Sequence, residues 1–288
     1  MERPLRAIGL MLLACFLFSV SDAISKLLGE TMPPVEIGFF RYVVFVAMAA
    51  GMAWQAGVNP WQVQDPVRQV VRGLALVGSG LFFIVALRHL PLADAAAVGF
   101  ISPLLITALS VPMLGERVGF RRWAAVVVGL IGVLLVVRPG TGAFKPEALW
   151  VLASSSTWAV ASVLSRQMAG RDHPATTILW SAVVGLILLT VLLPFQWAVP
   201  TGYELLLCFG LGVFASTGQI LMLQSYRFAG ASTLAPFIYV QLAWSTSLGW
   251  LIWGTLPDQW TWLGTAVIVA SGIYTVHRER VRARERGA

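Results

Sequence analysis

Residues 7–27 read AIGLMLLACFLFSVSDAISKL, and this stretch decides the class of fold. Its only charged residues are Asp22 and Lys26. A helix needs about 20 apolar residues to cross the ~30 Å hydrocarbon core of a bilayer, so the stretch predicts a membrane-spanning helix. The whole chain has the same character, because 58% of its 288 residues are hydrophobic, 11% are charged and the mean hydropathy is +0.79. This composition argues against a water-soluble domain, and the length of the runs argues against barrel strands, which would have about ten residues of alternating polarity.

Breaks at proline, glycine and charged residues divide the chain into ten such spans. The sequence therefore predicts an all-α membrane protein with ten transmembrane helices. Their predicted limits are residues 7–27, 35–55, 70–87, 93–114, 123–137, 149–168, 175–197, 205–226, 233–254 and 260–277.

The basic residues predict how these helices are oriented. The net charge is +7, but Lys and Arg gather at the ends of spans and in the tail at 278–288 rather than in one patch, which indicates membrane orientation instead of nucleic-acid binding. With a cytoplasmic N-terminus, ten basic residues and the five tail arginines fall on the cytoplasmic side, against five on the other. We therefore expect a multi-pass protein of a bacterial-type inner membrane with both termini in the cytoplasm.

The chain also contains an internal repeat. A shift of 140 residues aligns FSVSDAISK at 18–26 with WAVASVLSR at 158–166 and continues without a gap to Pro34 on Pro174. Farther along, a shift of 139 pairs residues of the same type: Arg88 with Arg227, Gly115 with Gly254 and Trp123 with Trp262.

The repeat predicts two units of five helices, at residues 1–142 and 143–277, followed by a basic cytoplasmic tail at 278–288. Because five is odd, the second unit enters the membrane from the opposite side, which gives a pseudo-two-fold axis in the membrane plane. Transporters with this architecture bind their solute near the bilayer midplane and rock one bundle against the other.

Several motifs resemble the drug/metabolite transporter superfamily, specifically its EamA type. They are ALRHLPLADAAA at 86–97, Ser-Pro-Leu at 102–104, Leu-Gly-Glu-Arg at 114–117, and Pro34 with Arg41. The resemblance covers the whole chain and implies ten helices, two EamA units and usually export of amino acids or other small metabolites. The second copy departs from the pattern, since Thr255 stands where the family often has Glu and Ser181 takes the place of Arg41. The aromatic-rich interior is also similar to that of the amino-acid exporters of the YddG kind.

Asp22 is the deepest acid in the predicted spans, where a central charge costs about 2 to 3 kcal/mol by insertion scales. It lies about five residues from the outer end of its span, and Arg41 lies at a comparable depth on the next, antiparallel span. We therefore predict an ion pair between them. Three roles stay open: a tie between two helices, recognition of the ammonium and carboxylate of a zwitterionic solute, or proton coupling through Asp22, which a permanent pair would disfavour.

Hydroxyl, amide and aromatic side chains recur at helical spacing on several spans and would line a cavity between the repeats. Such a lining suits a neutral or zwitterionic solute with an apolar side chain better than a polyanion. A purely structural role stays open for each residue, because Ser and Thr often bond to their own helix and Trp often faces lipid. The candidate cavity residues are Ser19, Asp22, Ser79, Phe83, Trp158, Ser162, Gln219, Met222, Tyr239, Gln241 and Trp244.

Two prolines fall at nearly matching places in the two repeats, Pro103 in the fourth span and Pro236 in the ninth. Proline removes a backbone donor and bends its helix. An interruption in corresponding helices of both halves is typical of a binding site or hinge. We predict hinges at both prolines.

Features of other protein classes are not found in the sequence. The three histidines fall at the ends of predicted helices, and Cys15 and Cys208 have no second Cys or His at ligand spacing, so we expect no enzyme activity, no metal site and no cofactor. The sequence also lacks a filter-like segment and a nucleotide-binding motif.

The sequence thus predicts a secondary transporter that exports small metabolites, above all neutral or aromatic amino acids, by alternating access through a central cavity. A multidrug or other metabolite exporter stays an alternative, as do a channel and an intramembrane enzyme. The expected partners are a small-molecule substrate and membrane lipid, without nucleic acid. The oligomeric state stays open, with a monomer favoured.

Overall fold

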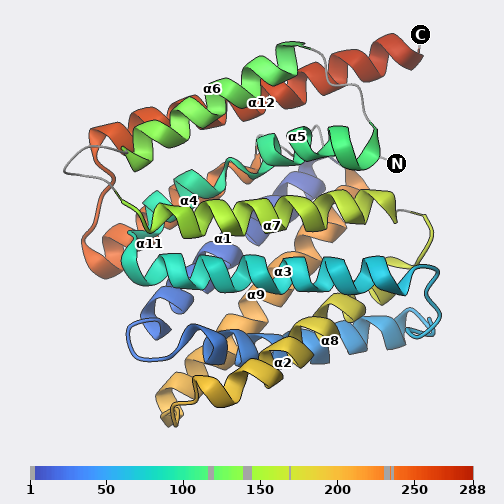
Figure 1. Cartoon of the computed structure of the whole chain (residues 1–288), viewed down its shortest axis with the longest axis vertical. Helices are drawn as coiled ribbons and strands as arrows, with labels where there is room; N and C mark the ends of the chain where they lie inside the picture. The colour runs from blue at the N-terminus through green and yellow to red at the C-terminus, as the bar shows by residue number, and fades with distance from the viewer. Residues whose placement is uncertain are drawn as a thin grey trace.

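The structure is a computed structural model that describes residues 4–115, 120–138, 145–168, 170–229, 234 and 237–287. Within these ranges, side chains are described except at 4, 121–122, 275–276 and 278–287. All regular secondary structure in the described ranges is helical (Figure 1). The predicted all-α class is therefore confirmed.

The helices follow one another with short connections. The first half contains α1 (Pro4–Leu28), α2 (Pro34–Gln55), α3 (Pro66–His89), α4 (Leu92–Gly99), α5 (Ser102–Leu114) and α6 (Phe120–Val137). The second half contains α7 (Ala148–Gln167), α8 (Pro174–Leu192), a short 3-10 turn η1 (Leu193–Phe195), α9 (Gly202–Phe228), α11 (Val240–Trp253) and α12 (Gln259–Gly287). Proline occupies the first turn of α2, α3 and α8, where its missing N–H leaves no intrahelical bond unmade.

In the described part of the chain, seven helical segments are long and apolar enough to cross a membrane: Leu5–Leu28, Pro34–Gln55, Pro66–His89, Leu92–Leu114, Ala148–Gln167, Pro174–Phe195 and Gly202–Phe228. Each coincides with a predicted span. A shorter apolar helix, Trp123–Val137, matches the fifth prediction. The ninth predicted span lies partly outside the described residues and is represented by α11, and the tenth corresponds to the first part of α12.

The fourth predicted span is interrupted. Phe100 and Ile101 form a turn between α4 and α5, so the segment is helical on both sides of a break. The hydroxyl of Ser102 donates to the Gly99 carbonyl oxygen at 2.6 Å, and Ser155 on α7 donates to the same oxygen at 3.4 Å. A break inside a membrane helix is stable only where freed carbonyls find such partners.

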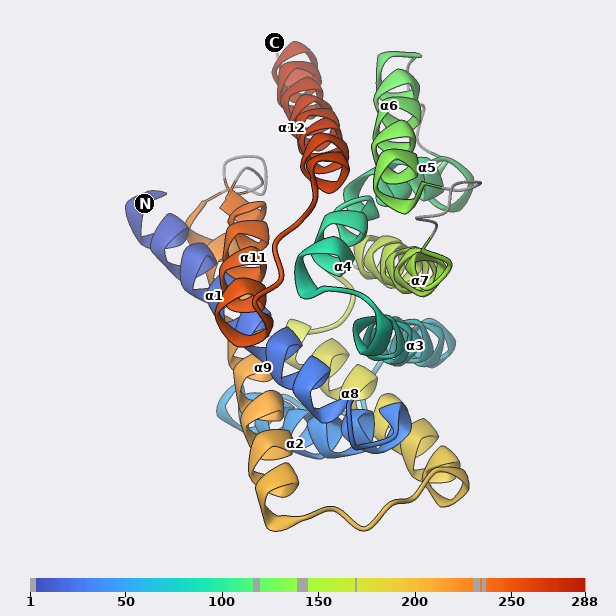
Figure 2. The same cartoon turned by 90° about the vertical axis from the view of Figure 1, so that its left-hand side faces the viewer.

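The helices pack in pairs drawn from the two halves of the chain. α1 lies along α9, α3 along α7, α2 along α8, and α6 along α12. Figures 1 and 2 show α6 and α12 side by side at one edge of the bundle and α2 with α8 at the opposite edge. Among the remaining contacts, α3 touches α8 and α2 touches α9, while α5 touches α7 and α1 touches α11.

Glycines allow some of these pairs to approach closely. A Cβ at Gly73 on α3 would lie 2.8 Å from Cβ of Val184 on α8, and one at Gly212 on α9 would lie 2.5 Å from Cβ of Val44 on α2. Both distances are far inside van der Waals contact, so no larger residue fits without a shift of the helices. Small residues at such positions are a general feature of helix packing in membranes.

Candidate functional site

The contact between α1 and α11 brings three of the predicted cavity residues together. Ser19 on α1 is fully buried, donates its hydroxyl to the Gln241 carbonyl oxygen at 3.2 Å, and lies 3.3 Å from the hydroxyl of Ser245. The side-chain amide of Gln241 donates to Oδ2 of Asp22 at 3.4 Å. Asp22 lies one turn after Ser19 on α1, and its contact is therefore also with α11.

Asp22 and Arg41 are both half-buried and form no salt bridge in this structure, so the predicted ion pair stays a prediction. The Arg41 side chain extends from α2 toward α3, where its Nη1 lies 3.8 Å from the place that a Cβ on Gly80 would occupy. Within the described ranges, Arg41 has no hydrogen-bond or ion-pair partner. Gln241 of α11 thus contacts Asp22, and the Arg41 guanidinium lies beside α3, from where its charge still acts on Asp22.

Ser79 and Phe83 lie on α3 near its contact with α7. The hydroxyl of Ser79 is buried 3.2 Å from that of Ser154 on α7, and either can donate. Phe83 is partly buried and packs against the largest core cluster, which includes residues of α3, α4 and α7. Ser79 is therefore engaged in helix packing, whereas Phe83 contributes aromatic surface beside it.

On α7, the hydroxyl of Ser162 donates to the carbonyl oxygen of Trp158 at 2.8 Å, so it satisfies itself on its own helix. Met222 of α9 is partly buried against a core cluster that contains Met11 and Cys15 of α1. Gln219, one turn earlier on α9, is half-buried and makes no hydrogen bond with another described residue.

Two further predicted residues form ring contacts. Tyr239, next to the start of α11, lies 4.9 Å from Phe100 between ring centroids, which connects it to the break between α4 and α5. Trp244 of α11 makes an edge-on contact with Phe16 of α1 at 5.1 Å. Tyr239 therefore lies toward α4, whereas Trp244 is partly exposed at the rim of the α1–α11 contact.

The structure places Pro103 in the first turn of α5, directly after the break. The bend lies just before the proline instead of within a continuous helix, and Pro103 loses no intrahelical bond at this position. Pro236 lies outside the described residues.

A polar network at one end of the bundle was not predicted. Arg72 turns inward from α3, donates to the hydroxyl of Ser165 on α7 at 2.7 Å, and also donates to the carbonyl oxygen of Thr177 at 3.2 Å and to the hydroxyl of Ser181 on α8. The neighbouring Gln69 donates to Asp172 at 2.8 Å. The only sequence signal was Ser181, noted as the counterpart of Arg41, whereas Arg72 was counted among the charges at the ends of spans.

Lys26 makes the main contact at the other end. Its ammonium donates to the carbonyl oxygens of Leu87 and Leu90 on α3, both at 2.8 Å, and lies 5.5 Å from the ring centroid of Trp253. The indole N–H of Trp253 donates to Glu30 at 3.3 Å. These contacts tie α1 to α3 and α11.

Two salt bridges lie near the same end. Lys145, between α6 and α7, pairs with Asp94 of α4 at 2.5 Å, and Arg138 pairs with Asp258 at 2.5 Å. Burial acts to raise the pKa of Asp258, but hydrogen bonds from Thr261 and the charge of Arg138 outweigh it, so the pKa lies below its usual value. Among the described residues, no group of three His, Cys, Asp or Glu side chains could hold a metal ion.

Comparison with known proteins finds similarity over nearly the whole chain. The sequence model of the EamA-like transporter family matches residues 5–138 and again residues 145–276. A pseudopaline exporter from Pseudomonas aeruginosa is 31% identical and covers 92% of this chain and 93% of its own. An S-adenosylmethionine uptake transporter from Rickettsia felis is 27% identical over 96% of this chain and 94% of its own, and a riboflavin transporter from Rhizobium johnstonii is 27% identical over 96% and 92%.

A solved crystal structure shares the fold. It superposes with a TM-score of 0.64 at 24% identity and covers 95% of this chain and 97% of the other. This likeness concerns the fold alone.

Proposed function

This chain belongs to the EamA-like transporter family, and from that premise we propose that it is a secondary transporter that carries a zwitterionic organic solute by alternating access between two inverted repeats. The family and the relatives' names indicate a membrane transporter rather than an enzyme. The substrate, the repeat symmetry and the site are the parts that we propose.

The helix pairs support an inverted repeat. The repeat pairs α1 with α7, α2 with α8, α3 with α9 and α6 with α12. When each helix is exchanged for its counterpart, the contact of α1 with α9 becomes that of α7 with α3. In the same way, the contact of α3 with α8 becomes that of α9 with α2. All four contacts are made. The contacts of α2 with α8 and of α6 with α12 exchange into themselves, as pairs on a two-fold axis would.

Individual residues support it as well. Gly73 and Gly212 are 139 residues apart and Val44 and Val184 are 140 apart, so the close approach of Gly73 to Val184 and that of Gly212 to Val44 are the same contact in the two halves. These are the shifts found in the sequence alignment. Chance resemblance between apolar helices would not reproduce both the register and the contact.

The observation that carries the proposed substrate class is the separation of Asp22 from Arg41. An acid and a base half-buried inside a membrane bundle are costly unless something pairs with them. Asp22 accepts one long hydrogen bond, and Arg41 has no partner within the described ranges. The ammonium and carboxylate of an α-amino-acid group would pair with the two side chains, and Phe83 and Trp158 would offer apolar surface to the rest of the solute.

The names of the relatives fit a broad substrate class. S-adenosylmethionine ends in an α-amino-acid group, which is the chemistry that Asp22 and Arg41 would recognise. The relatives are named for both uptake and export. We propose that the direction follows the solute gradient, since a reversible carrier runs either way.

We further propose that both termini lie in the cytoplasm. The positive-inside rule supports this orientation, because ten basic residues and the five tail arginines fall on the side of the termini. The Arg72 network would then lie at the cytoplasmic end, and the Lys26 contacts would lie at the opposite end.

Counterflow tests the proposal. Purified protein in liposomes loaded with unlabelled solute is offered labelled S-adenosylmethionine, neutral amino acids and riboflavin in turn. We expect saturable counterflow of a solute with an α-amino-acid group, and a loss of at least about tenfold with Asp22→Asn or Arg41→Gln, since each removes one charge-assisted hydrogen bond.

Asp65→Asn is the matched control. Asp65 caps α3 at the surface, where Asn also caps, so counterflow should not change. Transport by Asp22→Asn at the wild-type rate, or counterflow of riboflavin alone, would contradict the proposed site.

A further inference from the structure

A cavity lies at the end of the bundle where α1 and α3 finish. Its volume is about 590 Å³, which is within the usual range of small-molecule sites. Its lining comes from residues 31–35, from the last turns of α3, from Trp150 at the start of α7, and from residues 196–198 before α9. None of the proposed central cavity residues is among the residues that line it.

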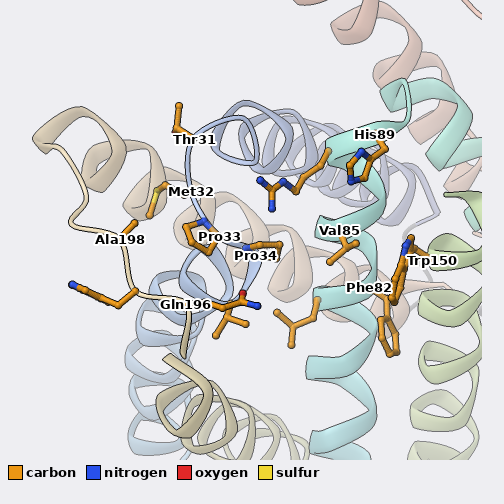
Figure 3. Close-up of a pocket in the computed structure, with 14 residues that line it drawn as sticks. Thr31, Met32, Pro33, Pro34, Phe82, Val85, His89, Trp150, Gln196 and Ala198 are labelled. Atoms are coloured by element: carbon orange, nitrogen blue, oxygen red, sulfur yellow. The ribbon is translucent and has the colours of Figure 1, made fainter. Parts of the chain in front are cut away.

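Aromatic rings line this cavity, which we call the rim pocket. Phe82 stacks on Trp150 with centroids 5.7 Å apart and planes 30° apart, and Trp150 is 43% exposed. Trp197, which also lines the pocket, has its ring centroid 6.4 Å from that of Phe40. Figure 3 shows Phe82 and Trp150 facing the segment that carries Pro33 and Pro34, with the space between them. A flat apolar group can stack against such rings, because aromatic faces attract stacked rings.

Arg88 provides a positive charge at the pocket. Its side chain is exposed, and among the described residues it has neither a salt-bridge nor a hydrogen-bond partner. His89 beside it is also exposed, has no partner among the described residues, and adds a second donor. The Arg88 stem lies against Gly29, since a Cβ at Gly29 would be only 2.9 Å from its Cγ.

The acids next to the lining are engaged elsewhere. Glu30 accepts from Trp253 at 3.3 Å, Glu204 accepts from Thr31 at 2.6 Å, and Glu36 accepts from the backbone N–H of Ala198 at 3.3 Å. None of them forms a salt bridge with Arg88. The guanidinium is therefore available to an anion from outside the chain.

We propose that the rim pocket binds an organic anion with a flat apolar part, whose anionic group pairs with Arg88 and whose flat part stacks on Phe82 and Trp150. The anion comes either from solution or from the membrane as an amphiphile with an acidic head. This site is separate from the proposed central cavity.

Flavin mononucleotide and riboflavin make a matched pair of probes, because they share a flat ring system and differ by a phosphate. The wild-type protein in dodecyl maltoside, which carries no charge, is titrated into each probe while flavin fluorescence is followed. We expect saturable quenching by flavin mononucleotide, with binding about tenfold weaker for riboflavin and for Arg88→Gln with flavin mononucleotide. Trp150→Ala should weaken the binding of both probes.

Two further variants separate a placed guanidinium from general charge. Gly29→Ala keeps Arg88 but displaces its stem, so it should also weaken the binding of flavin mononucleotide several-fold. Arg227→Gln makes the same chemical change at the corresponding position of the other half, away from the pocket, and should leave binding unchanged. Equal affinity of Arg88→Gln and Arg227→Gln, or no saturable quenching by the wild type, would overturn the proposal.

Added phosphatidylglycerol distinguishes the two sources of the anion. Competition with flavin mononucleotide that Arg88→Gln abolishes supports a membrane amphiphile, and binding without competition supports a soluble anion. Because the readout is binding and not counterflow, this proposal and the transport proposal fail independently.

Discussion

Arg72 shows how one residue can hold three helices together. Its guanidinium donates from α3 to α7 and α8 through Ser165, Thr177 and Ser181. Without Arg72 these contacts disappear, and a partly buried polar cluster is left without its donor. Losing a charge-assisted hydrogen-bond cluster of this kind typically costs about 2 to 3 kcal/mol.

We therefore expect Arg72→Met to lower the midpoint of thermal unfolding in detergent by several degrees. Arg68→Met is the matched control, because Arg68 lies one turn earlier and forms a partly exposed i,i+3 pair with Asp65. Such pairs contribute about 0 to 1 kcal/mol, so the control should unfold near the wild-type temperature. Equal midpoints for the two variants would show that the inward network does not stabilise the fold.

Single charged residues were also the hardest to place from sequence. Depth along a helix was enough to predict that Asp22 and Arg41 lie inside the bundle, but it did not determine which neighbour each side chain reaches. Asp22 turns to Gln241, about 220 residues away in the chain, and Arg72 finds partners about a hundred residues away. Contacts of that range depend on how helices pack, which hydropathy and spacing do not encode.

At the scale of helices, the sequence was more informative. Runs of apolar residues of membrane length predicted the long spans, because the thickness of the hydrocarbon core imposes that length. The bend predicted at Pro103 lies just before that proline, at Phe100 and Ile101, and its exact position within one apolar run was not predicted. Ser102 at the start of α5 and Ser155 of another helix both donate to the Gly99 carbonyl oxygen, and no local pattern reports the Ser155 bond.

Glycine substitutions test the helix pairing. Alanine at Gly73 or Gly212 would place a methyl group against Val184 or Val44, and overpacking of this kind typically costs about 1 to 3 kcal/mol. We expect both variants to lower the thermal midpoint in detergent by similar amounts, since the two contacts correspond.

Gly78→Ala is the control on the same helix as Gly73. The nearest atom to a Cβ at Gly78 is 3.9 Å away, on Phe82, so the methyl group fits and the higher helix propensity of alanine should leave stability equal or slightly greater. If Gly78→Ala lowered the thermal midpoint as much as Gly73→Ala, close helix packing would not be the reason for glycine at position 73.

For the whole molecule, the orientation in the membrane is open to direct measurement. In a background without the two buried native cysteines, His89→Cys and Arg171→Cys place single thiols at exposed positions at opposite ends of the bundle. A membrane-impermeant maleimide added to intact cells should label position 89 at once and position 171 only after the cells are opened. The reverse pattern would invert the orientation that the basic residues predict.

The two halves differ in one contact that bears on the transport cycle. Lys26 ties α1 to α3 through the Leu87 and Leu90 carbonyl oxygens. The corresponding residue of the second half, Arg166, is exposed and makes no such bond in the described part of the chain, and α7 and α9 do not pack as α1 and α3 do. Under the proposed repeat symmetry, the bundle is therefore closed at the Lys26 end, and the matching contact at the opposite end is open.

Alternating access requires these two contacts to exchange. Lys26→Cys with Leu90→Cys, and Arg166→Cys with Ala229→Cys, place thiols at corresponding positions of the two ends, since the members of each pair are related by shifts of 140 and 139. A short bifunctional thiol reagent should link the first pair readily and the second poorly in the absence of solute. A transported solute at saturating concentration should shift yield from the first pair to the second, because it stabilises states through which the carrier cycles. In a protein carrying all four thiols, each molecule should form only one of the two cross-links. Both links in the same molecule would mean that the two ends close independently, which is incompatible with a rocking carrier.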